Sequence, residues 1–233
     1  MTLDVLKKTW FEHFGRSYPS KIVAVGLNYL DHFEEARLAL PSLSLPREPS
    51  IFSKLANTLI GDGDPILLPR ESRHLDAEAE LAIVIGQKAR RVPAREGLDV
   101  VAGYTVANDV SARDLQSKER HICRSKNFDT FCPILPVIVP VAQLGDARNL
   151  KIIQRLNDVV LQDGNTKEFI FGVPELIEYV SLSMTLEPGD IILTGTPAGV
   201  GIFREPPVPL RPDDCVEIEI EGIGCLRNSV MSE

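Results

Sequence analysis

Three acidic residues alternate along one short segment, Asp76-Ala-Glu78-Ala-Glu80, directly before the apolar run at 81–85. In an extended strand successive side chains point to opposite faces, so these three acids would share one face. Acids two residues apart lie about 6.6 Å from each other, which lets neighbouring carboxylates approach one cation. Crowded anions beside a core resist ionisation, and a bound cation removes that conflict. The segment indicates a metal site or, alternatively, an ordinary strand whose polar face meets water.

A further acid, Asp109, directly follows a predicted strand that ends at Asn108. Polar groups at the end of a strand, where the chain leaves the core, are well placed to build a site. Taken alone, Asp109 would be a turn or helix N-cap residue rather than a ligand. Together with Glu78 and Glu80 it makes a ligand set of oxygen atoms only, which suits Mg²⁺, Mn²⁺ or Ca²⁺ rather than zinc.

The elements that would position these acids are mostly strands. From residue 21 onward, short apolar runs are separated by Gly, Pro and Asp, a pattern typical of strands. A hairpin is expected around Asn157-Asp158, and the clearest helix covers residues 173–184 with Pro174 in its first turn. The strands do not alternate with helices, so the expected fold is a strand-dominated α+β domain. The expected strands cover 21–29, 65–69, 79–86, 99–110, 134–141, 150–157, 190–195 and 215–224.

Residues 1–20 predict a short amphipathic helix, an N-terminal extension to a single domain over 21–233. This segment lacks the uninterrupted apolar core of a signal peptide, and no apolar run is long enough to span a membrane. The four cysteines form no CxxC motif, so reduced thiols and a cytoplasmic location are expected. The 33 acids outnumber the 25 bases, giving a net charge of -8, and basic runs are short, so no nucleic-acid partner is expected.

An ordered set of motifs resembles the fumarylacetoacetate hydrolase superfamily from about residue 21 to residue 228. The motifs are VGLNYLDHFEE, IFSK, HLDAEAELAIVIG, VAGYTVANDVSARDLQ, KNFDTFCP, LQDGNTKEFIF and LEPGDIILTGTPAGVG. The resemblance implies a mixed β-sandwich roll and a homodimer. It also implies Mg²⁺ or Mn²⁺ bound through an E-x-E pair and a later Asp, which match Glu78, Glu80 and Asp109.

The same resemblance assigns roles to other residues. His32 and Glu35 match a dyad carried on a lid, here about residues 28–45, and Lys126 matches the lysine of K-x-F-D. Two departures from the family pattern, Leu55 in place of a proline and the absence of an aromatic near Ile122, bear on substrate shape. The expected substrate-binding residues are Asn28, Tyr29, Arg113, Gln116, Gly195 and Thr196.

These groups suit the chemistry of a small 2-oxo acid. A metal would polarise the 2-oxo group and stabilise an enolate, His32 is a suitable base, and Lys126 would stabilise negative charge. The leading hypothesis is hydrolysis of a C–C bond in an acylpyruvate-like β-diketo acid, with water activated by His32 and Glu35. The alternatives are an isomerase or decarboxylase of a hydroxymuconate-type dicarboxylate, an oxaloacetate decarboxylase, and a non-catalytic binder of metal or dicarboxylate.

Overall fold

The computed structural model describes residues 2–118 and 122–233. Its α-helices are α1 (Leu3–Phe14), α2 (Leu30–Ala39), α3 (Arg113–Gln116), α4 (Val141–Leu144) and α5 (Val173–Ser183). Single turns of 3-10 helix cover Ala56–Thr58, Thr166–Glu168 and Gly201–Phe203, and a longer stretch covers Ala94–Val100. The strands are β1 (Ile22–Gly26), β2 (Ser50–Lys54), β3 (Leu59–Ile60), β4 (Ile66–Leu68), β5 (Leu75–Asp76), β6 (Ala79–Ile85), β7 (Val101–Asn108), β8 (Ser111–Ala112), β9 (Cys132–Pro133), β10 (Val139–Pro140), β11 (Lys151–Leu156), β12 (Val159–Asn165), β13 (Ile191–Leu193), β14 (Cys215–Ile220) and β15 (Gly224–Ser232).

A six-stranded mixed sheet, in the order β10-β7-β6-β13-β1-β2, forms the centre of the fold. β6 pairs antiparallel with both β7 and β13, while β1 and β13 run parallel. Every residue of β6 is buried, which explains why its sequence is a nearly continuous apolar run rather than an alternating one. The one acid inside that run, Glu80, is therefore held in the interior of the protein.

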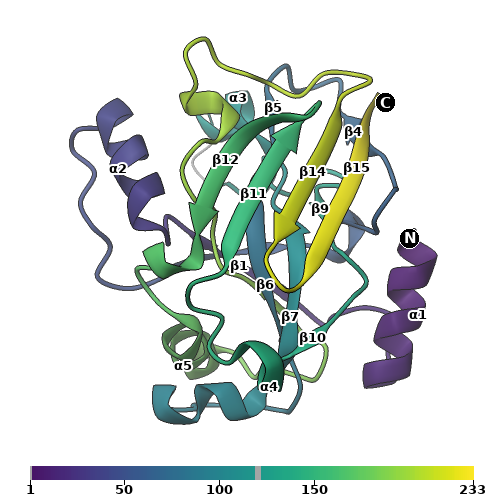
Figure 1. The fold of residues 1–233 in the computed structure, drawn as a ribbon, viewed down its shortest axis with the longest axis vertical. Helices are drawn as coiled ribbons and strands as arrows, with labels where there is room; N and C mark the ends of the chain where they lie inside the picture. Colours follow the sequence, from purple (N-terminus) through teal and green to yellow (C-terminus); the bar gives the residue numbers. More distant parts are fainter. Residues whose placement is uncertain (1, 119–121) are drawn as a thin grey trace.

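A second sheet of five strands, in the order β12-β11-β14-β15-β4, packs over the first (Figure 1). Its β11–β12 hairpin turns at Asn157 and Asp158, whose φ values of 51° and 68° are those of a tight turn with two left-handed residues. Alternate residues of β11 and β15 are buried, so one face of this sheet meets the core and the other meets solvent. The predicted strand-dominated α+β fold and its sandwich of mixed sheets are confirmed.

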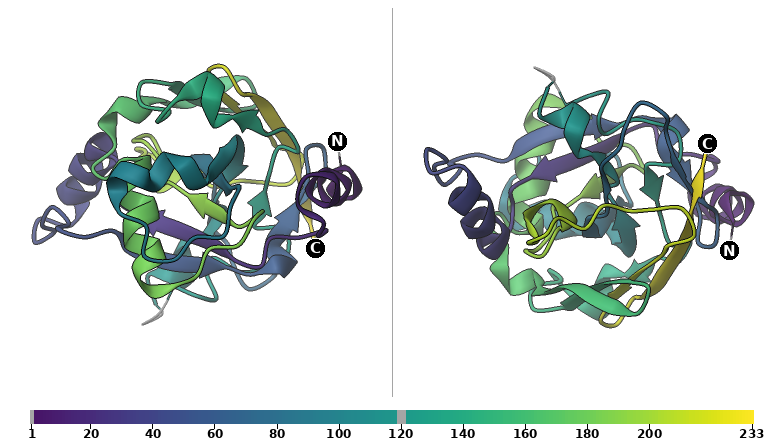
Figure 2. Two further views of the ribbon diagram at one scale, coloured as in Figure 1. Left: turned by 90° about the horizontal axis from the view of Figure 1, so that it is seen from below. Right: turned by 90° about the horizontal axis from the view of Figure 1, so that it is seen from above.

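The helices lie at the periphery. α1 and α2 occupy opposite ends of the molecule in both views of Figure 2. The predicted N-terminal helix is packed on the domain, because α1 buries Leu6 and Trp10, and the Trp10 indole donates a hydrogen bond to the carbonyl of Gly189 (2.8 Å). α5 fulfils its prediction and contributes Leu176, Ile177 and other apolar residues to the main core.

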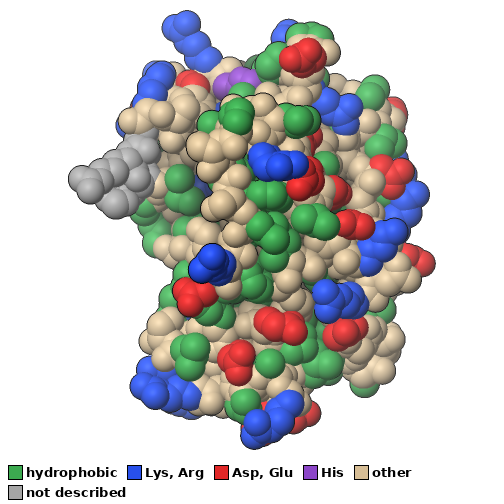
Figure 3. All heavy atoms as spheres, turned by 90° about the vertical axis from the view of Figure 1, so that its left-hand side faces the viewer, with side chains coloured by type: hydrophobic (Ala, Val, Ile, Leu, Met, Phe, Trp, Pro, Cys, Tyr) green, Lys and Arg blue, Asp and Glu red, His purple; other side chains and the backbone are tan. Residues whose placement is uncertain are grey.

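The surface around α2 carries several exposed apolar side chains. Figure 3 faces this side of the molecule and shows apolar side chains gathered between charged ones. The large apolar residues that are more than a third exposed in and beside α2 are Leu30, Leu38, Leu40 and Leu45. None of the helices in 2–118 or 122–233 combines the length and the hydropathy of a membrane span.

Two predictions of local structure were wrong. Residues 76–85 do not form one continuous strand, because β5 ends at Asp76 and β6 begins only at Ala79. Asp76 therefore does not alternate with Glu78 and Glu80 on one face and stands outside their cluster. The expected strand over 134–141 is reduced mainly to the two residues of β10, in a segment where Pro136 and Pro140 lack the N–H that a sheet ladder requires.

Candidate active site

The three acids predicted to bind metal come together at the end of two neighbouring strands. Glu80 lies in β6, Glu78 lies just before it, and Asp109 follows β7, where the main chain of Asp109 donates a hydrogen bond to the carbonyl of Glu78 (3.0 Å). One carboxylate oxygen from each residue lies within 4.8 Å of the others. All three side chains are buried, at 5%, 1% and 0% exposure for Glu78, Glu80 and Asp109.

Positive charge surrounds two of these acids. The Lys126 ammonium donates to Glu78 Oε2 (2.7 Å) and to Asp109 Oδ2 (2.6 Å). The Lys54 ammonium, also buried, donates to Asp109 Oδ1 (2.6 Å). A buried carboxylate is stabilised by such charged partners, and Glu78 and Asp109 both have them.

Arg113 extends this network to a fourth acid. Its guanidinium binds Glu78 and also donates through Nε to Asp76 Oδ2 (3.1 Å). Asp76 in turn accepts the backbone N–H groups of Gly201 (2.9 Å) and Ile202 (3.1 Å). Asp76 thus connects the 201–202 turn to Arg113 by hydrogen bonds and is not itself part of the carboxylate cluster.

Glu78 and Glu80 stand in opposite electrostatic environments. Burial alone would raise the pKa of Glu78, but Arg113 and Lys126 outweigh it and hold that pKa well below its usual range. For Glu80, burial and the nearby charges of Asp109 and Glu78 all act in one direction and raise its pKa well above the usual value. The carboxyl group of Glu80 makes one hydrogen bond among the described residues, from the N–H of Gly195 (2.7 Å).

The cluster therefore has the composition of a site for a hard divalent cation. Glu78, Glu80 and Asp109 supply only oxygen atoms, and the second oxygen of Glu80 has no protein donor in the described part of the chain. If all are ionised, the four acids Asp76, Glu78, Glu80 and Asp109 face three cations, so one negative charge is left without a partner. A divalent cation would compensate that charge.

His32 and Glu35 form the pair that sequence spacing predicted. Both lie in α2, three residues apart, and His32 Nδ1 lies 3.0 Å from Glu35 Oε2. The other oxygen of Glu35 accepts the N–H of Gly199 (2.9 Å), which fixes the carboxylate. His32 lies against the ring of Phe203, with centroids 5.9 Å apart, and among the described residues no group hydrogen-bonds its Nε2. This nitrogen is left for a ligand.

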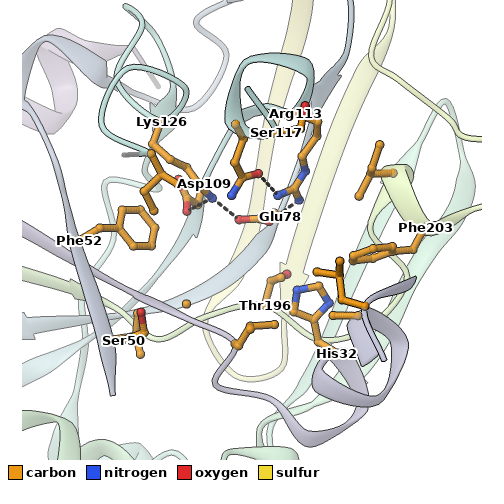
Figure 4. A pocket seen from close by; sticks show the side chains of 18 of the residues that line it. His32, Ser50, Phe52, Glu78, Asp109, Arg113, Ser117, Lys126, Thr196 and Phe203 are labelled. Atoms are coloured by element: carbon orange, nitrogen blue, oxygen red, sulfur yellow. Dashed lines mark hydrogen bonds and ion pairs between the residues drawn. The ribbon is translucent and has the colours of Figure 1, made fainter. Parts of the chain in front are cut away.

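The carboxylate cluster and the histidine face one cavity of about 580 Å³. Figure 4 shows Lys126, Glu78 and Arg113 along one side of this cavity, with His32 and Thr196 across from them. Both kinds of group can therefore contact the same small molecule. The apolar part of the wall comes from Val25, Leu27, Ala36, Leu40, Leu43, Phe52, Ile122, Ile202 and Phe203.

The predicted substrate-binding residues divide into two groups. Arg113, Gln116 and Thr196 line the cavity, and the Gln116 amide oxygen accepts a hydrogen bond from Arg113 Nη1 (3.0 Å). Thr196 is 3% exposed, and its hydroxyl oxygen accepts a hydrogen bond from the amide of Gln162 (2.8 Å). Part of the 116–126 loop in which the family pattern changes, residues 119–121, lies outside the described residues.

The other three predicted substrate-binding residues contact the protein itself. The side-chain amide of Asn28 hydrogen-bonds backbone groups. Its Nδ2 donates to the carbonyls of Phe171 and Thr194, and its Oδ1 accepts a hydrogen bond from the N–H of Phe171. Tyr29 is fully buried against Phe169, with ring centroids 4.8 Å apart. These residues and Gly195, whose N–H binds Glu80, are not part of the cavity wall. Their contact with substrate stays a prediction.

Gln162 was not predicted as a site residue. Lys54 was only a weaker candidate for positive charge near an anionic ligand, and Asp76 was expected on one strand face with Glu78 and Glu80 but was given no role of its own. Each lies inside one of the family motifs quoted above, IFSK, HLDAEAELAIVIG and LQDGNTKEFIF. Their place in these motifs was the sequence signal that could have marked them as site residues. Their partners lie between 34 and 126 positions away in sequence, so spacing alone could not identify the contacts. Gln162 reaches the site from the five-stranded sheet, in strand β12.

Comparisons with known proteins agree with this geometry. The family described as fumarylacetoacetate (FAA) hydrolase C-terminal matches residues 21–231. The chain is 46% identical to human "Oxaloacetate tautomerase FAHD2A, mitochondrial" over 215 residues, 91% of this chain and 67% of the human protein. It is also 49% identical to the uncharacterized protein MJ1656 of Methanocaldococcus jannaschii over 215 residues, which are 92% of this chain and 84% of that protein.

A solved structure supports the same relationship. The crystal structure of 5-carboxymethyl-2-hydroxymuconate delta-isomerase from Mycobacterium smegmatis superposes with a TM-score of 0.81 at 41% identity, covering 92% of this chain and 80% of that one. The predicted family is therefore confirmed by sequence and by fold. The chain belongs to the fumarylacetoacetate hydrolase family, a family of enzymes.

Proposed function

We propose that this protein is a divalent-metal-dependent enzyme that moves a proton in a small 2-oxo acid, interconverting the keto and enol forms or isomerising a related dicarboxylate. The observation that carries the proposal is the shared cavity, in which His32 lies across from a buried cluster of Glu78, Glu80 and Asp109. Relatives with the names oxaloacetate tautomerase and hydroxymuconate isomerase support this reaction class over the hydrolysis expected first from sequence.

The reaction needs a base near carbon and positive charge near oxygen. In tautomerisation a proton leaves C3 of the 2-oxo acid, the electron pair moves toward the 2-oxo oxygen, and that oxygen gains a proton. His32 Nε2 is suited to exchange the C3 proton, since Glu35 binds the other ring nitrogen and orients the ring. A divalent cation held by Glu78, Glu80 and Asp109, either Mg²⁺ or Mn²⁺, would polarise the 2-oxo group.

Lys126 supplies further positive charge beside the cluster. Burial alone would lower the pKa of this lysine, but Asp109 and Glu78 outweigh burial and raise it. The ammonium therefore stays protonated at neutral pH and stabilises negative charge as it develops on a bound oxo acid. Its contacts to Glu78 and Asp109 hold it in place for that role.

The test is a turnover assay on the purified full chain with oxaloacetate. Proton NMR and enol absorbance would follow the approach to keto–enol equilibrium with Mg²⁺, with Mn²⁺ and with chelator. We expect metal-dependent acceleration above the uncatalysed rate and its loss in the His32→Ala variant. Absence of acceleration in metal-loaded protein, for oxaloacetate and for 5-carboxymethyl-2-hydroxymuconate, would contradict the proposal.

Hydrolysis of an acylpyruvate and decarboxylation of oxaloacetate are the second candidates. Hydrolysis is favoured by the same free Nε2 of His32, because a base in that position can also activate water. Acetylpyruvate in the assay distinguishes the reactions, since hydrolysis releases pyruvate and acetate. Decarboxylation of oxaloacetate releases carbon dioxide and pyruvate.

Two further predictions accompany this function. A homodimer is expected from the family resemblance, and light scattering of the purified protein measures its mass directly. A cytoplasmic location also stays a prediction, tested by fractionating cells that express the natural protein.

A further inference from the structure

Gln162 is a buried amide whose hydrogen bonds reach Thr196 in the cavity wall and two backbone groups behind it. It lies in β12 with 0% exposure, and its Oε1 accepts the backbone N–H of Ala79 (2.9 Å). Its Nε2 donates to the carbonyl of Pro197 (2.7 Å) and to the hydroxyl oxygen of Thr196 (2.8 Å). Gln162 thus connects the start of β6, which carries Glu80, to the loop that carries Thr196.

These contacts determine the orientation of the amide. A flipped Gln162 would place its NH₂ group against the N–H of Ala79 and its oxygen against the carbonyl of Pro197. Both contacts would then be repulsive, donor against donor and acceptor against acceptor. The NH₂ group must therefore face Pro197 and Thr196, and Thr196 must accept from it.

The orientation of the amide determines that of the hydroxyl. A threonine hydroxyl has one proton, and the Thr196 proton cannot point at Gln162, where another donor stands. Within 2–118 and 122–233, no group accepts that proton. Thr196 lines the cavity between His32 and Glu78 (Figure 4), so the remaining direction for its O–H is into the cavity.

We propose that Gln162 is a positioning residue that makes Thr196 a dedicated hydrogen-bond donor, selecting for an anionic oxygen of the substrate such as the carboxylate of a 2-oxo acid. The inference rests on the proposed function only in placing such an acid in this cavity. Binding of a ligand without turnover therefore tests it separately.

The probe is oxalate, a planar dianion that carries the carboxylate and the adjacent oxygen of a 2-oxo acid but cannot react. Calorimetry would measure oxalate binding to the Mn²⁺-loaded full chain. We expect Thr196→Val to weaken binding about ten- to a hundredfold, the usual value of a hydrogen bond to a charged group. Thr196→Ser keeps the hydroxyl and should retain most of the affinity.

The two substitutions at Gln162 act on the direction of the hydroxyl proton. In the Gln162→Glu variant, the new carboxylate would accept the proton of the Thr196 hydroxyl and turn it away from the cavity. Gln162→Met removes the amide donor without adding charge. Both should weaken oxalate binding and raise KM more than they lower kcat. Neither Gln162 substitution should weaken oxalate binding further in a protein that already carries Thr196→Val, because the hydroxyl is then absent.

Gln154 provides a matched control. It pairs directly with Gln162 across the β11–β12 ladder and is 1% exposed, yet its amide atoms have no hydrogen-bond partner in the described structure. Gln154→Met should therefore leave oxalate affinity unchanged. Full affinity in Thr196→Val would overturn the inference, as would an undiminished effect of Gln162→Met in the Thr196→Val background. Failure to turn over both oxaloacetate and 5-carboxymethyl-2-hydroxymuconate, with normal oxalate binding, would contradict the proposed function and leave this inference standing.

Discussion

The two sides of the cavity are held together by different forces. On the strand side, Glu78 and Asp109 are bound by the charged side chains of Lys126, Arg113 and Lys54, and all of these groups are buried or nearly so. On the α2 side, Glu35 binds His32 and the backbone N–H of Gly199 instead of a lysine or arginine.

The backbone donors on that second side come from one segment. The N–H group of Gly199 binds Glu35 of α2, while those of Gly195, Gly201 and Ile202 reach across to Glu80 and Asp76 on the strand side. Removing one partner of a buried salt bridge strongly destabilises a protein, because the other charge is left buried and unpaired. A single backbone hydrogen bond contributes only about 1 kcal/mol to stability. We therefore expect metal binding to respond strongly to changes of charge on the strand side, and we expect the His32–Glu35 pair to be alterable without disturbing metal binding.

The largest effect is expected from His32→Ala on the α2 side. Loss of the base should lower turnover of oxaloacetate about a thousandfold, within the usual range for a general base. Mn²⁺ affinity should stay within twofold of the unsubstituted protein, because among the described residues His32 hydrogen-bonds Glu35 and none of the three acids of the cluster. A large drop in Mn²⁺ affinity would show that the two sides are not separable.

The next largest effect is expected from Glu80→Ala on the strand side. Outer-shell changes at metal sites cost ten- to a hundredfold in affinity, so loss of a ligand should weaken Mn²⁺ binding by at least about a hundredfold in calorimetry. Glu219→Ala, at an exposed acid of β14, is the matched control and should not change it. Retention of Mn²⁺ affinity in Glu80→Ala would contradict the assignment of this metal site.

A smaller effect is expected where the two sides are joined. Asp76→Asn keeps one acceptor oxygen but loses the charge that faces Arg113, so the free energy of unfolding should fall by about 2 kcal/mol. Denaturant titration measures this change. Asp163→Asn, at a mostly exposed carboxylate 3.4 Å from Lys151, should change the stability by less than about 0.5 kcal/mol.

The smallest effect concerns the pH dependence of stability without metal. The pKa of Glu78 is lowered in the folded protein, so its contribution to stability is present at neutral pH and lost as the pH falls into the acidic range. The pKa of Glu80 is raised, so its contribution has the opposite sign and is lost as the pH rises through the folded-state value.

The variant Glu80→Gln separates these two contributions. It keeps an acceptor for the N–H of Gly195 but cannot ionise, so the metal-free protein should lose less stability between mildly acidic and neutral pH than the unsubstituted chain. Thermal unfolding in chelator across that range provides the measurement. Identical pH profiles for the two proteins would show that Glu80 does not carry an uncompensated charge.

Local pattern in the sequence determined the elements and the set of candidate ligands. The apolar run of β6 predicted a buried strand, the Asn157-Asp158 pair predicted a hairpin, and E-x-E with a later acid predicted a cluster. These features depend on residues close together in the chain, where the periodicity of side chains is a sufficient guide. The order of the motifs along the chain was also sufficient to identify the family.

Only the tertiary structure decided how each polar group is used. Asp76 belongs to the same alternating pattern as Glu78, yet the break between β5 and β6 directs it to Arg113 and the 201–202 turn. Gln162 carries no local signal of a site residue, because its partners come from other strands and loops. A buried polar group must be satisfied by whatever donor or acceptor the fold brings next to it, and that depends on contacts between distant segments that spacing does not reveal.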